Sequence, residues 1–145
     1  MPTRCQVHVT GFAQNEPPIS LYHHCDGYPE NMVPLLQDAR IKASTNWKNG
    51  CAGRLVLLHP HRVASFIVAI DPGGYDIELS PALHSDIEYL YQLIVQNHHY
   101  SKEPTWKLRI LIPKPGFWNA PDLAHMKLLW QGLIEDADPA VKATP

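Results

Sequence analysis

Fourteen prolines divide this chain of 145 residues into short segments, and they limit what it can fold into. The usual frequency of proline would give roughly seven in a chain of this length. A proline inside a helix removes a backbone hydrogen bond and clashes with the preceding turn, and in a sheet proline is confined to edges and bulges. The prolines therefore limit the length of each element and mark the turns between elements.

Between these prolines, apolar and polar residues alternate in several segments with the period of two that is typical of half-buried strands. The five predicted strands cover residues 4–10, 19–24, 75–79, 86–95 and 106–112. A short connection joins the first two, so they are predicted to pair as a hairpin.

The second predicted strand determines where two neighbouring histidines point. Successive side chains along a strand lie on opposite faces of the sheet. His23 is therefore predicted on the face of Ile19 and Leu21, directed inward, and His24 on the opposite face beside Tyr22.

Three further segments are predicted to be helices. The first begins at Pro29, whose fixed φ suits a first helical turn, and ends near Ala43. In residues 63–70 the apolar side chains recur at helical spacing, and residues 123–134 are leucine-rich. This order of elements predicts an α+β fold, with an antiparallel or mixed sheet of about five strands and helices packed on one face.

The length and composition are those of one folded domain, predicted to cover residues 1–136 and to be followed by a flexible tail at 137–145. A formal net charge of −2 argues against a nucleic-acid partner, which requires a basic excess. No apolar run approaches the roughly 20 residues that cross a bilayer, so no membrane partner is expected. Three widely spaced cysteines without a signal peptide indicate free thiols and a cytoplasmic protein.

The densest set of chemically reactive side chains lies in residues 22–29, which read Tyr-His-His-Cys-Asp-Gly-Tyr-Pro. One interpretation is structural: Asp26 closes a turn, Gly27 supplies an unusual backbone conformation, and Tyr28 packs beneath the helix. The other is a binding site, because polar groups converge where a strand leads into a helix. The candidate ligand-binding residues are His24, Asp26, Tyr28 and Tyr22.

The pattern Tyr-x-His-x-Asp-Gly-Tyr-Pro resembles a motif of small uncharacterised proteins encoded by phages and prophages. Residues 84–91 also resemble the Gly-Asp-Ile-Glu-Tyr-x-Tyr strand of those proteins, and the resemblance covers roughly residues 7–91. This chain departs from the family at Cys25, where those proteins commonly have tryptophan, and at Ser85, which replaces the glycine. The resemblance implies an accessory protein of a mobile element, in a class where inhibitors of host defence are common, and it implies no activity.

Two enzymatic alternatives remain open. Cys25 with a nearby histidine and Asp26 has the residue types of a thiol hydrolase. His24, Cys25, His59 and His61 have the residue types of a zinc site, although the spacing typical of zinc sites is missing. The sequence contains no cofactor-binding motif, and we expect no cofactor and no metal.

Aromatic and basic residues interleave near the C-terminus, and such residues are enriched at interfaces. Trp106, Lys107, Arg109 and Trp118 are the predicted interaction surface. The leading hypothesis is a non-enzymatic binding protein, either an inhibitor of host defence or a ligand-sequestering factor. Its partner would be a host protein or a small molecule, and a homo-oligomer whose assembly is its function is a further alternative.

Overall fold

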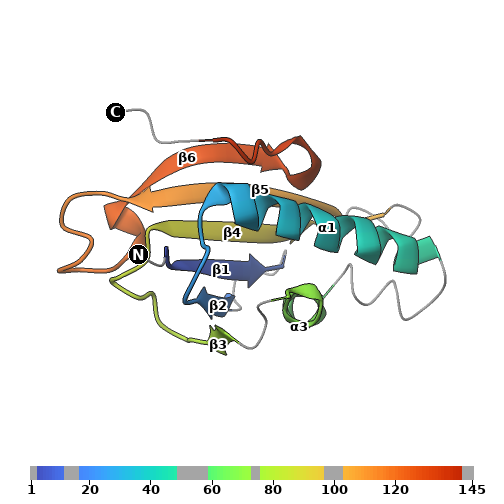
Figure 1. The fold of residues 1–145 in the computed structure, drawn as a ribbon, viewed down its shortest axis with the longest axis horizontal. Coiled ribbons are helices and arrows are strands. Elements are labelled where there is room, and N and C mark those ends of the chain that lie inside the picture. Colours follow the sequence, from blue (N-terminus) through green and yellow to red (C-terminus); the bar gives the residue numbers. More distant parts are fainter. Residues whose placement is uncertain (1–2, 12–16, 49–58, 73–75, 97–102, 142–145) are drawn as a thin grey trace.

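A computed structural model describes residues 3–11, 17–48, 59–72, 76–96 and 103–141 of the chain (Figure 1). In chain order the larger elements are β1 (Cys5–Thr10), β2 (Ile19–His23), α1 (Pro29–Lys48), α3 (Pro60–Ile70), β3 (Ile77–Leu79), β4 (Tyr89–Gln96), β5 (Thr105–Pro113) and β6 (Met126–Leu133). Two short 3₁₀ helices, η2 (Leu123–His125) and η3 (Ile134–Asp136), flank β6.

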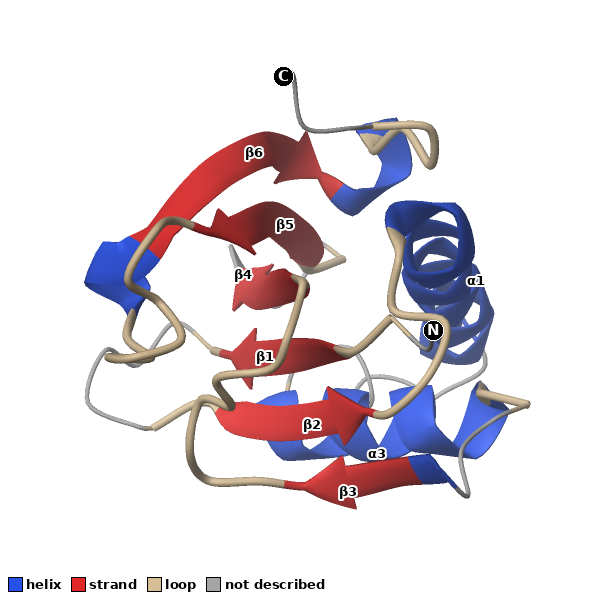
Figure 2. Cartoon of the chain, turned by 60° about the vertical axis from the view of Figure 1, so that its left-hand side comes forward, coloured by secondary structure: helices blue, strands red, loops and turns tan. Residues whose placement is uncertain are grey.

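The strands form one six-stranded sheet in the order β3-β2-β1-β4-β5-β6. β1 and β4 are parallel, and the other neighbouring pairs are antiparallel, so the sheet is mixed. Both α1 and α3 lie on the same face of the sheet (Figures 1 and 2). The predicted α+β fold is confirmed, with six strands instead of about five. None of the helices in the described ranges is long and apolar enough to cross a bilayer.

Alternation along the strands decides which side chains face the helices. On β1, Cys5, Val7 and Val9 point toward α1 and α3 and are fully buried. Leu21 and Trp106 extend the same cluster across neighbouring strands. The helices contribute the other wall of this core, which consists of Met32, Val33, Leu36, Ala39, Ala43, Val63, Ala64 and Ile67.

The helix-free face of the sheet carries a second apolar cluster at one end and a polar row across its middle. Tyr22, Ile87, Leu90, Leu111, Phe117 and Met126 form the cluster. The strand register places five polar side chains side by side in the row: Ser20, His8, Gln92, Arg109 and Gln131. His8 and Ser20 are buried despite lying on this face.

The helix predicted for residues 123–134 is wrong. This segment begins with the single turn η2, in which the Asp122 carboxylate accepts a hydrogen bond from the backbone N–H of His125 at 3.1 Å. It then becomes the edge strand β6, which pairs with β5 through a bulge near Ile110. The spacing of the leucines favours a helix in an isolated segment. Hydrogen bonding to the neighbouring strand β5 overrides this local preference and makes the segment a strand.

The first helix is longer than predicted, because α1 continues to Lys48 instead of ending near Ala43. The start of the predicted C-terminal tail packs against it. Ala137 is buried, and its carbonyl accepts a 3.0 Å hydrogen bond from the Gln37 amide. Val141 contacts the main core, and residues 142–145 lie outside the described part of the chain.

Candidate functional site

The Asp-Gly pair forms a tight joint between β2 and α1. Asp26 has a φ of 56°, the left-handed conformation that Asp tolerates better than most residues. The N–H of Gly27 donates to the carbonyl of Thr3 at 2.8 Å, and the Tyr91 hydroxyl donates to the carbonyl of Gly27 at 2.7 Å. The joint is therefore anchored to the segment just before β1 and to β4.

Gly27 is required by close approach to β1. A Cβ atom at this position would lie 2.7 Å from the Cβ of Cys5 and 2.9 Å from its backbone N. We expect Gly27→Ala to lower the free energy of unfolding by about 1–3 kcal/mol, because the strand or the joint must move. Urea unfolding monitored by circular dichroism measures this loss.

Asp26→Gly is the matched control in the same turn. It removes a side chain from a position whose φ favours glycine, so the free energy of unfolding should stay within about 1 kcal/mol of the wild-type value. Equal losses for the two variants would contradict the close-packing explanation.

A polar cleft lies beside this joint. It has a volume of about 360 Å³ and is formed where the β2–α1 joint meets the C-terminal end of α3 and the start of β3. Its polar lining residues are His23, His24, Cys25, Asp26, Asn31, Asp71 and Asp76. Asn31 also supports the joint, because its amide donates to the carbonyl of Asp26 at 2.8 Å.

His23 is the most buried ionisable side chain of the cleft, with 5% of its surface exposed. Its Nδ1 lies 3.6 Å from Oδ2 of Asp71, and its Nε2 has no hydrogen-bond partner. Burial lowers the pKa of His23, although the Asp71 carboxylate opposes that shift. The ring is therefore neutral at pH 7. With its proton on Nδ1, facing the carboxylate, Nε2 presents a lone pair that can accept a hydrogen bond.

His24 points to the other side of β2, as alternation predicts. The ring centroids of His24 and Tyr22 lie 4.6 Å apart, with the two rings nearly perpendicular. The Nε2 of His24 lies 3.6 Å from Oε1 of Glu78. The ring of Tyr22 also stacks on that of His84, with their centroids 4.0 Å apart. The Tyr22 hydroxyl donates a hydrogen bond to Oδ2 of Asp86 at 2.8 Å. Burial, together with this hydrogen bond, raises the pKa of Tyr22 to about 12, so the phenol stays protonated.

The structure brings together two of the four predicted ligand-binding residues. His24 and Asp26 line the cleft. Tyr22 instead belongs to the apolar cluster on the helix-free face. Tyr28 is 39% exposed, and its hydroxyl lies 3.4 Å from Oδ1 of Asp26, but it is not part of the cleft lining.

Cys25 is exposed and lies in an environment that disfavours a nucleophilic thiolate. A hydrogen bond to the Asp76 carboxylate raises the pKa of the Cys25 thiol, and the negative charges of Asp76 and Asp26 act in the same direction. Catalytic cysteines require the opposite, a pKa lowered by positive charge or a helix N-terminus. Burial likewise raises the pKa of Cys5, and Cys51 lies outside the described residues.

The histidines do not assemble into a metal site in the part of the chain that the structure describes. No group of three His, Cys, Asp or Glu side chains there is arranged to hold a metal ion. His61 lies near the N-terminal end of α3, whereas Asp71 and the cleft lie at its C-terminal end.

The prediction that Trp106 belongs to the aromatic and basic interaction surface is wrong. Trp106 is fully buried in the main core, because it lies on the face of β5 that points toward the helices. Lys107 and Arg109 point to the opposite face and are partly exposed, and Arg109 donates to the Gln92 amide oxygen at 2.9 Å. Trp118, which is 64% exposed, lies in the β5–β6 connection.

Sequence reasoning missed Asp71 and Asp76 as residues of the cleft. Their place in the sequence, on either side of a Pro-Gly-Gly turn, predicted only the end of a helix. Nothing local indicates that Asp71 and Asp76 lie beside residues 23–26.

Comparison of the chain with protein-family models, with curated proteins and with solved structures finds no match in any of the three.

Proposed function

We propose that this chain is a non-enzymatic binding protein whose polar cleft holds a small ligand that carries a positive charge and hydrogen-bond donors. The single observation that carries this proposal is the acceptor-rich lining of the cleft, in which the carboxylates of Asp26, Asp71 and Asp76 surround one cavity beside the ring of His23.

The charges around the cleft support a cationic ligand. Asp26, Asp71 and Asp76 line it. No lysine or arginine is among the described lining residues. Carboxylates are acceptors, so they match an ammonium or guanidinium group in both charge and hydrogen bonding.

The thiol chemistry supports binding without turnover. Cys25 is the one nucleophilic side chain among the described lining residues, and its raised pKa keeps it a thiol. The second candidate function is a small hydrolase, which the His23–Asp71 pair favours, because a histidine oriented by a carboxylate is the usual general base. In that case water would be the nucleophile.

The resemblance to phage and prophage proteins supports a sequestering role. A protein that binds a small molecule tightly and releases it unchanged can deprive a host pathway of that molecule. This role needs only a pre-formed cleft and enough protein, and it is consistent with a site that lacks an activated nucleophile.

Binding of simple cations tests the proposal. We expect ethylammonium and methylguanidinium chloride to shift the cleft resonances in ¹H–¹⁵N spectra at low ionic strength, and acetate to leave them unchanged. Asp71→Asn should weaken binding at least tenfold, which corresponds to about 1.4 kcal/mol. Asp38→Asn, which changes a carboxylate on α1 that pairs with Lys42, is the charge-matched control and should leave the affinity unchanged.

Two results would overturn this function. One is the absence of any saturable shift with either cation. The other is hydrolysis of an ester or phosphoester panel that is lost in His23→Gln, which would establish the hydrolase instead.

A further inference from the structure

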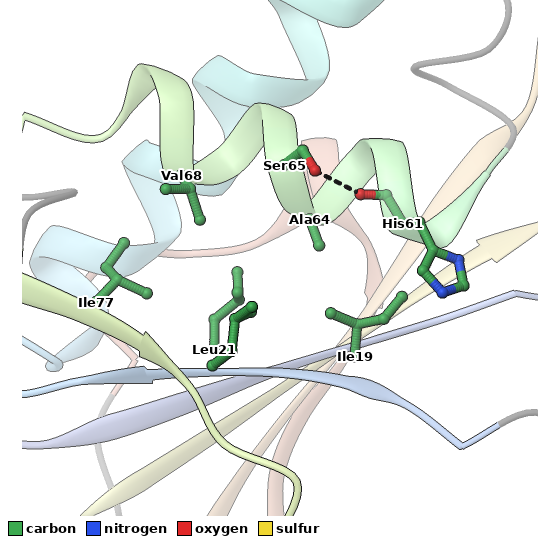
Figure 3. Close-up of a pocket in the computed structure, with 8 residues that line it drawn as sticks. Ile19, Leu21, His61, Ala64, Ser65, Val68 and Ile77 are labelled. Atoms are coloured by element: carbon green, nitrogen blue, oxygen red, sulfur yellow. Dashed lines mark hydrogen bonds between the residues drawn. The ribbon is translucent and has the colours of Figure 1, made fainter.

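A second cavity, an apolar pocket, is lined by neighbouring residues of the elements that form the polar cleft. This pocket has a volume of about 410 Å³ and lies between α3 and the strands β2 and β3 (Figure 3). Its apolar lining residues are Ile19, Leu21, Ala64, Val68, Ile77 and Leu79. In Figure 3 the side chains of Ala64 and Val68 point from the helix toward Leu21, Ile19 and Ile77 on the strands.

The two strands present their side chains in the same order, from apolar to polar. Along β2, Leu21 lines the apolar pocket, and His23, the next residue on the same face, lines the polar cleft. Along β3, Ile77 lines the apolar pocket, and Asp76 before it lines the cleft. His23 and Ile77 are direct cross-strand partners, so a residue that lines the cleft lies beside one that lines the apolar pocket.

The helix repeats this order. Val68 lines the apolar pocket, and Asp71, which caps the C-terminal end of α3, lines the polar cleft. From Ala64 to Asp71 the helix rises about 10 Å, which is the length of an alkyl chain of about eight carbons.

Only two polar side chains line the apolar pocket in the described part of the chain, His61 and Ser65. The Ser65 hydroxyl donates to the carbonyl of His61 at 3.0 Å, so its hydrogen is already engaged within the helix (Figure 3). The neighbouring polar cleft is lined instead by the ring of His23 and the carboxylates of Asp71 and Asp76. The apolar pocket therefore excludes charge, and the polar cleft accepts hydrogen bonds from a cation.

We propose that the two cavities form one trough that binds a cationic amphiphile, with its ammonium group at His23, Asp71 and Asp76 and its hydrocarbon chain between α3 and the β2–β3 pair. This inference rests on the proposed function, because it takes the polar cleft as the site of the cationic head. It adds the chemical class of the ligand, a primary amine with an aliphatic or aromatic tail.

A series of alkylammonium chlorides tests the trough, with ethyl, butyl, hexyl and octyl members used below their micellar concentrations. Each methylene that enters the apolar pocket should lower Kd about fourfold, so each two-carbon extension should lower it by about tenfold or more. Octanol and octanoate are the matched probes without a cationic head, and both should bind at least tenfold more weakly than octylammonium. Isothermal titration calorimetry measures all of these Kd values.

A pocket-filling variant tests whether the hydrocarbon chain of the ligand binds in the apolar pocket. Ala64→Leu places a larger apolar side chain in the pocket, and we expect it to weaken octylammonium binding at least tenfold while leaving ethylammonium binding unchanged. Ala69→Leu makes the same change at an exposed position of the same helix and should leave both unchanged. The chain-length series on the unaltered protein needs no variant, so it decides the question even if Ala64→Leu fails to fold.

The outcomes separate the two proposals. Saturable ethylammonium binding with a Kd that does not change with chain length would overturn the trough and leave the cationic site intact. Equal binding of octylammonium, octanol and octanoate, with no effect of Asp71→Asn, would overturn the cationic site and with it the trough. Tighter binding with each extension together with selection against octanol and octanoate supports both.

Discussion

Replacing Trp106 with alanine is expected to lower the free energy of unfolding by about 3–5 kcal/mol, the usual loss for removing a buried tryptophan. Trp106 is fully buried in the main core, between the sheet and the helices. The guanidinium of Arg40 on α1 lies 5.7 Å from the centre of its ring. Removal of the indole therefore leaves a cavity and also ends the contact that ties α1 to β5.

Trp118→Ala is the matched control, because it removes the same side chain from a position that is 64% exposed. Its effect on the free energy of unfolding should stay within about 0.5 kcal/mol. Urea unfolding of both variants at pH 7 measures the difference. If Trp118→Ala cost as much as Trp106→Ala, the assignment of one tryptophan to the core and the other to the surface would be wrong.

The second large effect is a loss of stability in acid that originates at His8. Burial lowers the pKa of His8 from 6.5 to about 4 in the folded protein. Its Nε2 has no hydrogen-bond partner, and the charged group in the same row of the sheet is Arg109, two strands away. Protonation would place a second positive charge on this face without an acceptor for its N–H.

The direction follows from comparing proton binding in the two states. Because the folded pKa of His8 is lower than the unfolded value, the unfolded chain binds the proton first. The stability contribution is complete above pH 6.5 and is lost as the pH falls toward 4. The difference between the two pKa values corresponds to about 3 kcal/mol. The lowered pKa of His23 acts in the same direction.

His8→Leu should remove most of this acid sensitivity. An apolar side chain of similar size leaves no unpaired polar atom, so its stability at pH 7 should be within about 1 kcal/mol of wild type. At pH 4 the variant should be more stable than wild type by about 2–3 kcal/mol. Urea unfolding at both pH values measures this gap, and His61→Gln, at an exposed position, is the control. A gap of the same size at both pH values would show that His8 does not titrate with folding.

The alternation of residues along the chain determined much of the fold. It located β1 and β2, and it placed His23 on the side of the helices, where it faces Asp71, and His24 beside Tyr22. The Asp-Gly pair indicated the joint between β2 and α1, and the structure gives the reason, since Gly27 packs against Cys5 without room for a side chain. These features are local, so short stretches of sequence are sufficient to specify them.

The identity of β6 depended on tertiary structure. Residues 123–134 have leucine spacing compatible with a helix, and only hydrogen bonding to β5 makes the segment a strand. The burial of Trp106 depended on tertiary structure in the same way. Strand alternation puts Trp106 on the face of β5 opposite Lys107 and Arg109, but whether that face is covered depends on α1, a helix far away in the sequence.

The sequence specified one part of the candidate site, and the tertiary structure specified the rest. The sequence by itself determined one wall of the polar cleft, residues 23–26, because a strand end and a turn are specified by neighbouring residues. Only the tertiary structure supplied the other wall, Asp71 and Asp76, and the apolar pocket beyond it. Those parts come together because α3 packs across β1 and β2, and this packing depends on contacts between residues about forty or more positions apart, which no local pattern in the sequence records.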